Sequence, residues 1–304
     1  MELHQLRYFL AVAETANFTR AAERCHITQP SLSQQILNLE RELGHKLFHR
    51  LGRKAVLTEA GTTFVQRARK VLMEVENATK ELKDQPNLDR KITVGAIPTV
   101  APYLVAPLIA KCRETHPNLE VHLREDFRSD LSRAVLEGDL DFAVVTLPIK
   151  DHRLSVEPLM VEPLLLVVGN VHPLSQRREI TTNELANETW VTMGDSSTLA
   201  AQIRAFCGDH NFAPKIGYRC AQVATLKMLV GMGVGISILP QVVQEAEERR
   251  TLTYLRLTDS FPTRELAVIR HLQRYQSRGA EQFLTLLRDH AHAQPPRHER
   301  EQHP

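Results

Sequence analysis

The sequence predicts a mixed α/β protein in which a helical N-terminal part precedes a longer part of alternating strands and helices. Up to about residue 84, apolar residues recur at three- and four-residue steps, the period of an amphipathic helix. From Lys91 onward, short apolar runs alternate with helical patterns, which is typical of an α/β fold. A break at Gln85-Pro86-Asn87 separates the two parts.

Length and composition indicate a globular protein. The 304 residues are enough for two or three compact units, and 42% hydrophobic with 24% charged residues excludes a disordered chain. No apolar run is long enough to cross a bilayer, and the first five residues lack the basic start of a signal peptide. We therefore expect a cytoplasmic protein without a membrane partner. Four cysteines without CxxC spacing predict reduced thiols and no metal site.

Three helices are predicted first. The apolar stripe of the first helix consists of Leu3, Leu6, Phe9, Leu10 and Ala13. The stripes of the next two, which are separated by a tight break, are Phe18, Ala21, Ala22 and Cys25, then Leu32, Ile36, Leu39 and Leu43. Thr28 and Pro30 supply the N-terminal signal of the third helix.

The start of the third helix exposes short, uncharged, hydrogen-bonding side chains. They are Gln29, Ser31, Ser33, Gln34 and Asn38. Gln and Asn can pair with adenine, and Ser can bond several bases, as on a recognition helix in the major groove. A helical hairpin with a solvated polar face explains the same pattern. The pattern alone therefore leaves nucleic-acid binding open.

A hairpin and a long helix follow. Alternation around Gly52 predicts the hairpin, with Arg50, Arg53 and Lys54 near its tip. Beside a recognition helix, these cations favour phosphate or minor-groove contact over a role in solubility alone. The helix, from Glu59 to about Asp84, carries a heptad seam of Phe64, Ala68, Val71, Val75, Ala78 and Leu82. Because nothing nearby in sequence forms a core for this helix, we expect it to pair with a second copy.

The second part predicts a buried, mostly parallel sheet with intervening helices. Strands are expected near 92–96, 120–123, 142–145, 164–169, 190–192, 215–218, 235–238 and 266–269. Helices are expected near 104–112, 131–136, 199–207, 226–230 and 283–287. The polar end of the chain is expected to be disordered.

Residues 1–58 resemble the winged helix-turn-helix of the LysR-type transcriptional regulators. The matching motifs are Leu6-Arg7-Tyr8-Phe9, Phe18-Thr19-Arg20-Ala21-Ala22, Thr28-Gln29-Pro30-Ser31-Leu32-Ser33 and Leu57-Thr58-Glu59-Ala60-Gly61. The later part resembles the family's effector-binding region, two α/β lobes of the periplasmic-binding-protein type. The resemblance implies a DNA-binding domain at 1–58, a dimerisation helix at 59–87, lobe I at 91–161 plus 266–290, lobe II at 162–265 and a disordered tail at 291–304.

This resemblance implies a DNA-binding transcriptional regulator that is not an enzyme and needs no cofactor. The chain has no HExxH, P-loop or GxSxG motif and therefore no candidate catalytic residue. The expected partners are promoter or operator DNA, a small-molecule effector and a second copy in a homodimer or homotetramer; RNA polymerase is a further partner that we consider. The expected DNA-binding residues are Thr19, Arg20, Gln29, Pro30, Ser31, Ser33, Gln34, Asn38, Arg50, Arg53 and Lys54.

The effector is expected between the two lobes. The expected residues are Thr99, Val100, Arg128, Thr146, Ser197 and Thr198, several of them near predicted helix starts, where backbone N–H groups point outward. Each hydroxyl could instead serve only as a helix cap. Arg128 favours a carboxylate-bearing effector, with a surface ion pair to Glu125 or Asp130 as an equal alternative.

The OxyR-like branch of the family gives the nearest resemblance, through Gly95–Leu104 and Ala205-Phe206-Cys207. In that branch a reactive cysteine begins a helix and a second one follows nine residues later. Here Cys207 matches the second cysteine, and Thr198 stands in place of the first. A hydroxyl cannot form a sulfenic acid or a disulfide. Redox sensing through Cys207, alone or with Cys220, stays an alternative, as does a small-molecule-binding protein without DNA activity.

Overall fold

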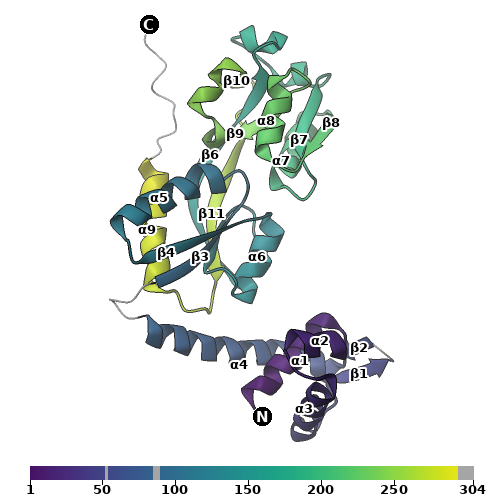
Figure 1. The fold of residues 1–304 in the computed structure, drawn as a ribbon. Helices are drawn as coiled ribbons and strands as arrows, with labels where there is room; N and C mark the ends of the chain where they lie inside the picture. The colour runs from purple at the N-terminus through teal and green to yellow at the C-terminus, as the bar shows by residue number, and fades with distance from the viewer. Residues whose placement is uncertain (52–53, 85–89, 294–304) are drawn as a thin grey trace. The chain divides into compact units, whose positions relative to one another are not determined.

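The computed structural model describes residues 1–51, 54–84 and 90–293. The chain divides into two compact units, Met1–Gln85 and Pro86–Pro304 (Figure 1). Arg53, the break at Gln85-Pro86-Asn87 and residues 294–304 of the expected tail lie outside the described residues.

The N-terminal unit contains the predicted helices and hairpin. They are α1 (Leu3–Thr15), α2 (Phe18–Arg24), α3 (Gln29–Leu43), β1 (Phe48–Leu51), β2 (Lys54–Leu57) and α4 (Glu59–Lys83). Asn17 caps α2 by accepting from the backbone N–H groups of Thr19 and Arg20, and the Thr28 side chain caps α3. Gly44 ends α3 in the left-handed region at φ 69°, a conformation that costs glycine little. The short break between α2 and α3 makes the pair a helix-turn-helix.

Large apolar side chains on α1 and α3 form the core of this unit. Leu6, Phe9, Leu32, Ile36 and Leu39 are each at most 1% exposed. The predicted stripe of α1 is rotated, because Leu3 is 41% exposed whereas Gln5 is 7% exposed and donates to Gln35 Oε1 at 3.0 Å. The period of α1 was predicted correctly, but its buried face was partly wrong.

Helix α4 packs on the unit's own core at its N-terminal end, which corrects part of the prediction. Ala68 is 1% exposed, and the ring of Phe64 lies 5.1 Å from that of Phe9. Further along the same seam, Val71, Val75 and Leu82 are 41%, 36% and 79% exposed. The first part of the seam therefore belongs to the core of the N-terminal unit, and its later part is an exposed apolar stripe.

Lobe I, with a hydrophobic core of its own, is built around the parallel strands β3 (Arg90–Ala96), β4 (Leu119–Glu125) and β5 (Phe142–Thr146). A single π-helical turn, η1 (Ala101–Val105), leads into α5 (Ala106–Thr115). Helix α6 (Arg128–Glu137) contacts β5, and α9 (Arg278–Ala293) contacts α5 (Figure 1). Ala291 is 4% exposed in this core, so α9 extends into the segment expected to be disordered from residue 291.

Lobe II has a second core. Its elements are β7 (Thr189–Met193), α7 (Thr198–Asp209), β8 (Lys215–Cys220), α8 (Val223–Gly231), β9 (Ser237–Pro240) and β10 (Leu252–Leu255). Short 3-10 turns lie at Pro173–Gln176, Thr182–Leu185, Gln241–Val243 (η4) and Ala246–Arg250 (η5). Strands β7 and β8 are parallel, and both α7 and α8 contact β7. The short strand β10 has no counterpart among the predicted strands.

Two long strands connect the lobes. Strand β6 (Leu154–Gly169) pairs antiparallel with β11 (Thr263–His271) over its first ten residues, then with β9 and β10. Strand β11 also pairs antiparallel with β5. The prediction of a mostly parallel sheet was therefore wrong for these strands, because strands that pass between lobes pair without the helical crossover that parallel neighbours require. Among the described residues, no helix is long and apolar enough to span a membrane.

Candidate DNA-binding and effector sites

Helix α3 separates a buried apolar face from a polar face. Leu32, Ile36 and Leu39 are fully buried, whereas Pro30, Ser31, Gln34 and Asn38 are exposed and Gln29 and Ser33 are partly buried. Gln29 Nε2 donates to Ser33 Oγ at 2.8 Å, and Gln34 Nε2 donates to Asn38 Oδ1 at 3.0 Å. These pairs span one helical turn and preorder side chains that can bond base edges.

Cations flank this helix, and their pairing sorts them into two groups. Glu14 binds Arg24 at 2.9 Å and Arg69 at 3.3 Å, and Glu40 binds Lys46 at 3.0 Å. In the part of the chain that the structure describes, Arg20, Arg50 and Lys54 have no acidic partner and are exposed. Thr19, beside Arg20 at the start of α2, is also exposed. The unpaired cations are thus among those expected to contact DNA.

Glu40 is a structural residue that the sequence reasoning missed. It is 6% exposed; its Oε1 accepts from the backbone N–H groups of Leu47 at 2.8 Å and Phe48 at 3.3 Å. These bonds attach the end of α3 to the start of the hairpin. A sequence signal existed, because Glu40 follows Ile36 by four residues and therefore lies on the apolar stripe.

In the C-terminal unit, which is expected to bind the effector and is called the effector unit from here on, Thr99 and Val100 lie inside the protein. Thr99 is 4% exposed, and Val100 is fully buried in the core of lobe I. Thr99 Oγ1 accepts from Arg264 Nη1 at 2.6 Å, and the Thr99 carbonyl accepts from Nη2 at 3.3 Å. Both Thr99 oxygens therefore already have a partner.

Arg264 and Glu162 form a buried ion pair where β11 and β6 run between the lobes. The side chains are 0% and 3% exposed, and Arg264 Nη2 lies 2.7 Å from Glu162 Oε1. Glu162 Oε2 also accepts from the backbone N–H of Val242 in η4 at 3.0 Å. The pair thus connects lobe I, through Thr99, to lobe II. A sequence signal existed, because Glu162 and Arg264 carry opposite charges next to the two predicted boundaries between the lobes.

Arg128 has carbonyl partners and no acidic one among the described residues. Its Nη1 donates to the carbonyl oxygens of Thr146 at 3.3 Å and Pro148 at 3.1 Å. The alternative ion pair is wrong for the described residues, since Asp130 pairs with Arg133 and the hydrogen bonds of Arg128 go to carbonyl oxygens instead of Glu125. Partial burial lowers the pKa of Arg128, so the guanidinium is desolvated without a compensating anion nearby.

Two hydroxyls meet beside Arg128. Thr146 Oγ1, fully buried at the end of β5, donates to Thr198 Oγ1 at the start of α7 at 2.9 Å. Ser197 is 8% exposed and caps α7 by accepting from the backbone N–H of Leu199 at 3.2 Å. Of the six expected effector residues, Arg128, Thr146 and Thr198 are thus brought together, whereas Ser197 serves as a helix cap and Thr99 and Val100 are enclosed.

A third interlobe contact lies at Tyr103 in η1. The Nζ of Lys227, a 5% exposed residue of α8, lies 4.9 Å from the Tyr103 ring centroid. The same Nζ donates to the Val243 carbonyl, to Glu245 at 3.1 Å and to Glu248 at 2.8 Å. Sequence reasoning missed this cluster, because its residues come from distant elements.

The cysteines of lobe II are buried free thiols. Cys207 is fully buried and Cys220 is 5% exposed, both in the lobe II core. Burial raises the pKa of the Cys207 thiol from 9.0 to about 12, so almost no thiolate exists near neutral pH. Within the described residues, no cluster of His, Cys, Asp and Glu could hold a metal ion.

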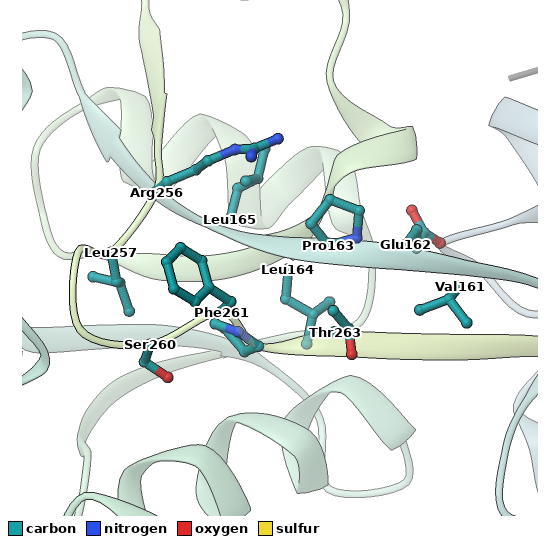
Figure 2. Close-up of a pocket in the computed structure, with 11 residues that line it drawn as sticks. Val161, Glu162, Pro163, Leu164, Leu165, Arg256, Leu257, Ser260, Phe261 and Thr263 are labelled. Atoms are coloured by element: carbon teal, nitrogen blue, oxygen red, sulfur yellow. The ribbon is translucent and has the colours of Figure 1, made fainter. Parts of the chain in front are cut away.

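An apolar pocket of about 210 Å³ lies where the loop after β10 passes strand β6 (Figure 2). Its lining comprises Val161–Leu165, Arg256, Leu257 and Ser260–Thr263. Phe261 is 75% exposed there. None of the six expected effector residues lines this pocket.

A helix-turn-helix unit with a polar helix face, followed by a two-lobed α/β unit, defines the class of effector-responsive transcriptional regulators. Residues 3–62 match the bacterial regulatory helix-turn-helix protein, lysR family, and residues 86–292 match the LysR substrate binding domain. The chain therefore belongs to the LysR family of DNA-binding transcriptional regulators and is not an enzyme. This excludes the alternative of a binding protein without DNA activity.

Relatives place the chain near the peroxide regulators. It is 34% identical over 294 residues to the hydrogen peroxide-inducible genes activator of Pectobacterium carotovorum subsp. carotovorum, covering 95% of this chain and 97% of that protein. It is also 34% identical over 242 residues to the Hca operon transcriptional activator HcaR of Escherichia coli K12, covering 79% and 82%. The structure of a full-length OxyR variant from Pseudomonas aeruginosa is similar with a TM-score of 0.68 and 26% identity, covering 96% and 94%.

Proposed function

We propose that this LysR-family regulator responds to a small carboxylate-bearing effector, which binds Arg128 between the two lobes. One observation carries the proposal. Arg128 is a partly buried cation that has only two carbonyl oxygens as partners among the described residues. A desolvated charge without a counter-ion is costly, and a carboxylate can compensate a guanidinium with two parallel hydrogen bonds.

Thr146 and Thr198 complete the proposed site. Their 2.9 Å hydrogen bond joins the end of β5 in lobe I to the start of α7 in lobe II. An effector that bonds either hydroxyl must replace this direct contact between the lobes. Its binding would therefore favour a different lobe arrangement, as an effector must in order to shift the equilibrium between two states.

We propose that this change of lobe arrangement alters DNA binding by a homodimer or homotetramer. The exposed later part of the α4 seam supports self-pairing, because Val71, Val75 and Leu82 are exposed apolar side chains at heptad spacing. Paired copies would place two α3 helices on neighbouring turns of an operator with two-fold symmetry. We place this activity in the cytoplasm, where promoter DNA is available.

Thermal shift tests the effector site. We expect some small carboxylic acids to raise the Tm of the wild-type protein, and the matching amides to have no effect. Arg128→Gln should abolish the shift, because it removes the cation but keeps a polar side chain. The matched control is Arg133→Gln on the same helix, where the arginine already pairs with Asp130. A shift that survives in Arg128→Gln would place the acid elsewhere and refute the proposal.

Redox sensing is the competing effector mechanism, and the names of several relatives favour it. Chemical features of this chain weigh against it. Cys207 is enclosed in the lobe II core with a pKa of about 12, and α7 begins at Thr198, which cannot be oxidised to a sulfenic acid. Relatives of equal identity also include HcaR, an activator named for an operon and not for peroxide.

A further inference from the structure

Arg50 of the hairpin lies over an aromatic ring of the helix-turn-helix. Its Cζ is 4.5 Å from the centroid of Phe18, the first residue of α2. The Phe18 ring in turn contacts Phe48 of β1 at 5.7 Å between centroids. Phe18 is partly buried and Arg50 is exposed, so the ring stands between the core and the cation.

The contact with the Phe18 ring leaves the hydrogen-bonding groups of Arg50 available. A guanidinium carries five N–H donors, and a ring that its Cζ faces accepts no conventional hydrogen bond from them. Within the described residues, the Arg50 side chain has neither an acidic partner nor a hydrogen bond, unlike Arg24 and Arg69, which both pair with Glu14. The contact therefore orders the side chain without consuming the groups that bind phosphate.

Ordering Arg50 in advance favours binding. A free arginine side chain loses rotamer freedom when it binds, and a side chain held in place beforehand loses less. Phe18 lies beside Thr19 and Arg20, which are exposed at the start of α2. The ring thus fixes a cation of the hairpin next to a second part of the surface expected to contact DNA.

We infer that Phe18 is a positioning residue for DNA binding, whose ring holds the Arg50 guanidinium ready for a backbone phosphate. The inference rests on the proposed contact between Arg50 and DNA. It assigns the aromatic residue at position 18 a role beyond core packing, and this role acts through Arg50.

The experiment measures affinity for a random-sequence duplex over a range of salt concentrations, using the full-length protein. Phe18→Leu keeps an apolar side chain but removes the π-face, and should weaken binding about two- to fivefold, the effect of an exposed cation–π contact. Arg50→Ala should weaken binding further and reduce the slope of log K against log salt by about 0.9, the value for one lost phosphate contact. Phe18→Tyr keeps the ring face and should bind like the wild type.

A double-mutant cycle separates positioning from packing. If Phe18 acts through Arg50, Phe18→Leu should have no further effect on binding in the Arg50→Ala background. The inference would be overturned if Phe18→Leu weakened DNA binding equally in the wild-type and Arg50→Ala backgrounds. It would also be overturned if Phe18→Leu had no effect in either background. Phe64→Leu is the matched control, because Phe64 packs on Phe9 and should affect Tm but not the salt slope. If the wild-type protein did not bind the duplex at all, DNA binding itself would be refuted. That outcome is distinguishable from failure of the inference about Phe18.

Discussion

At the scale of the residue, charge pairing distinguishes groups that hold the fold from groups available to ligands. Arg264 is fully buried and compensated by Glu162, so it is a structural cation. Arg128 is partly buried and has carbonyl partners alone in the described part of the chain. The two arginines come from elements that both approach the interlobe region, and their partners assign them different roles.

Cys207 provides a test of redox function at this scale. Native protein should react slowly with iodoacetamide at pH 8, because burial both encloses the thiol and raises its pKa to about 12. Mass spectrometry after timed quenching measures the modification, with the partly exposed Cys25 as an internal comparison. Rapid native modification of Cys207, or loss of DNA binding after peroxide in wild type but not in Cys207→Ala, would support the redox alternative.

The same thiol gives the sign of a pH effect on stability. Well below pH 9 the thiol is protonated in both the folded and unfolded states, so it contributes no pH dependence there. Between about 9 and 12, the unfolded chain loses this proton and the folded chain keeps it. The free energy of unfolding should therefore decrease as pH rises through this range, and less so in Cys207→Ala.

At the scale of the element, α4 differs in burial along its length. Its start packs on the core of the DNA-binding unit through Phe64 and Ala68. Its later part leaves Val75 and Leu82 exposed at heptad spacing. A change in the later part should therefore affect association without unfolding the helix-turn-helix.

We predict that Val75→Asp with Leu82→Asp prevents pairing through α4. Two carboxylates on the seam would have to be desolvated in a coiled coil, which is strongly unfavourable. Multi-angle light scattering should show a lower oligomeric state, and a 34.5 kDa monomer if α4 is the sole contact between copies. Lys70→Asp with Asn77→Asp, two positions off the seam, is the control. An unchanged mass for the seam variant would argue against this role of α4.

At the scale of the whole molecule, three contacts between described residues join the effector lobes. They are the Arg264–Thr99 bonds with the Glu162 ion pair, the Thr146–Thr198 hydrogen bond and the contact of Lys227 with Tyr103. Each contact joins residues that are distant in sequence. Disruption of the first should affect folding, whereas the second is the one that an effector could replace.

Glu162→Gln tests the first contact. Removing the carboxylate charge leaves the buried Arg264 without a compensating negative charge. Breaking such a buried pair lowers the free energy of unfolding by about 3–5 kcal/mol. Urea unfolding should report this loss in the free energy of unfolding of the effector unit. Glu157→Gln, which breaks a partly exposed pair with Arg288, should cost at most about 1 kcal/mol. Similar small effects for both variants would contradict a structural role for the buried pair.

Local periodicity predicted the order of helices and strands because amphipathic spacing depends on neighbouring residues alone. It could not predict that β6 and β11 pair antiparallel, since that register joins residues about a hundred positions apart. For the same reason, local periodicity could not predict the partners of Arg264 and Lys227, which lie far from them in sequence. It also hid the end of α9, because Ala291 is buried by contacts that a polar local sequence does not indicate. The polar face of α3 was easier to predict, since its residues lie within one helix.

Strand β6 belongs to both hydrophobic cores, with Leu159 in one and Leu166 in the other. We therefore expect neither half of the effector unit to fold as an independent fragment, because a cut between them divides a continuous strand. Deleting or inserting one residue in this strand would turn each inward-facing side chain in the rest of the strand outward, and each outward-facing one inward. Insertions are consequently expected to be tolerated in surface loops of either half and to be eliminated from this strand during evolution.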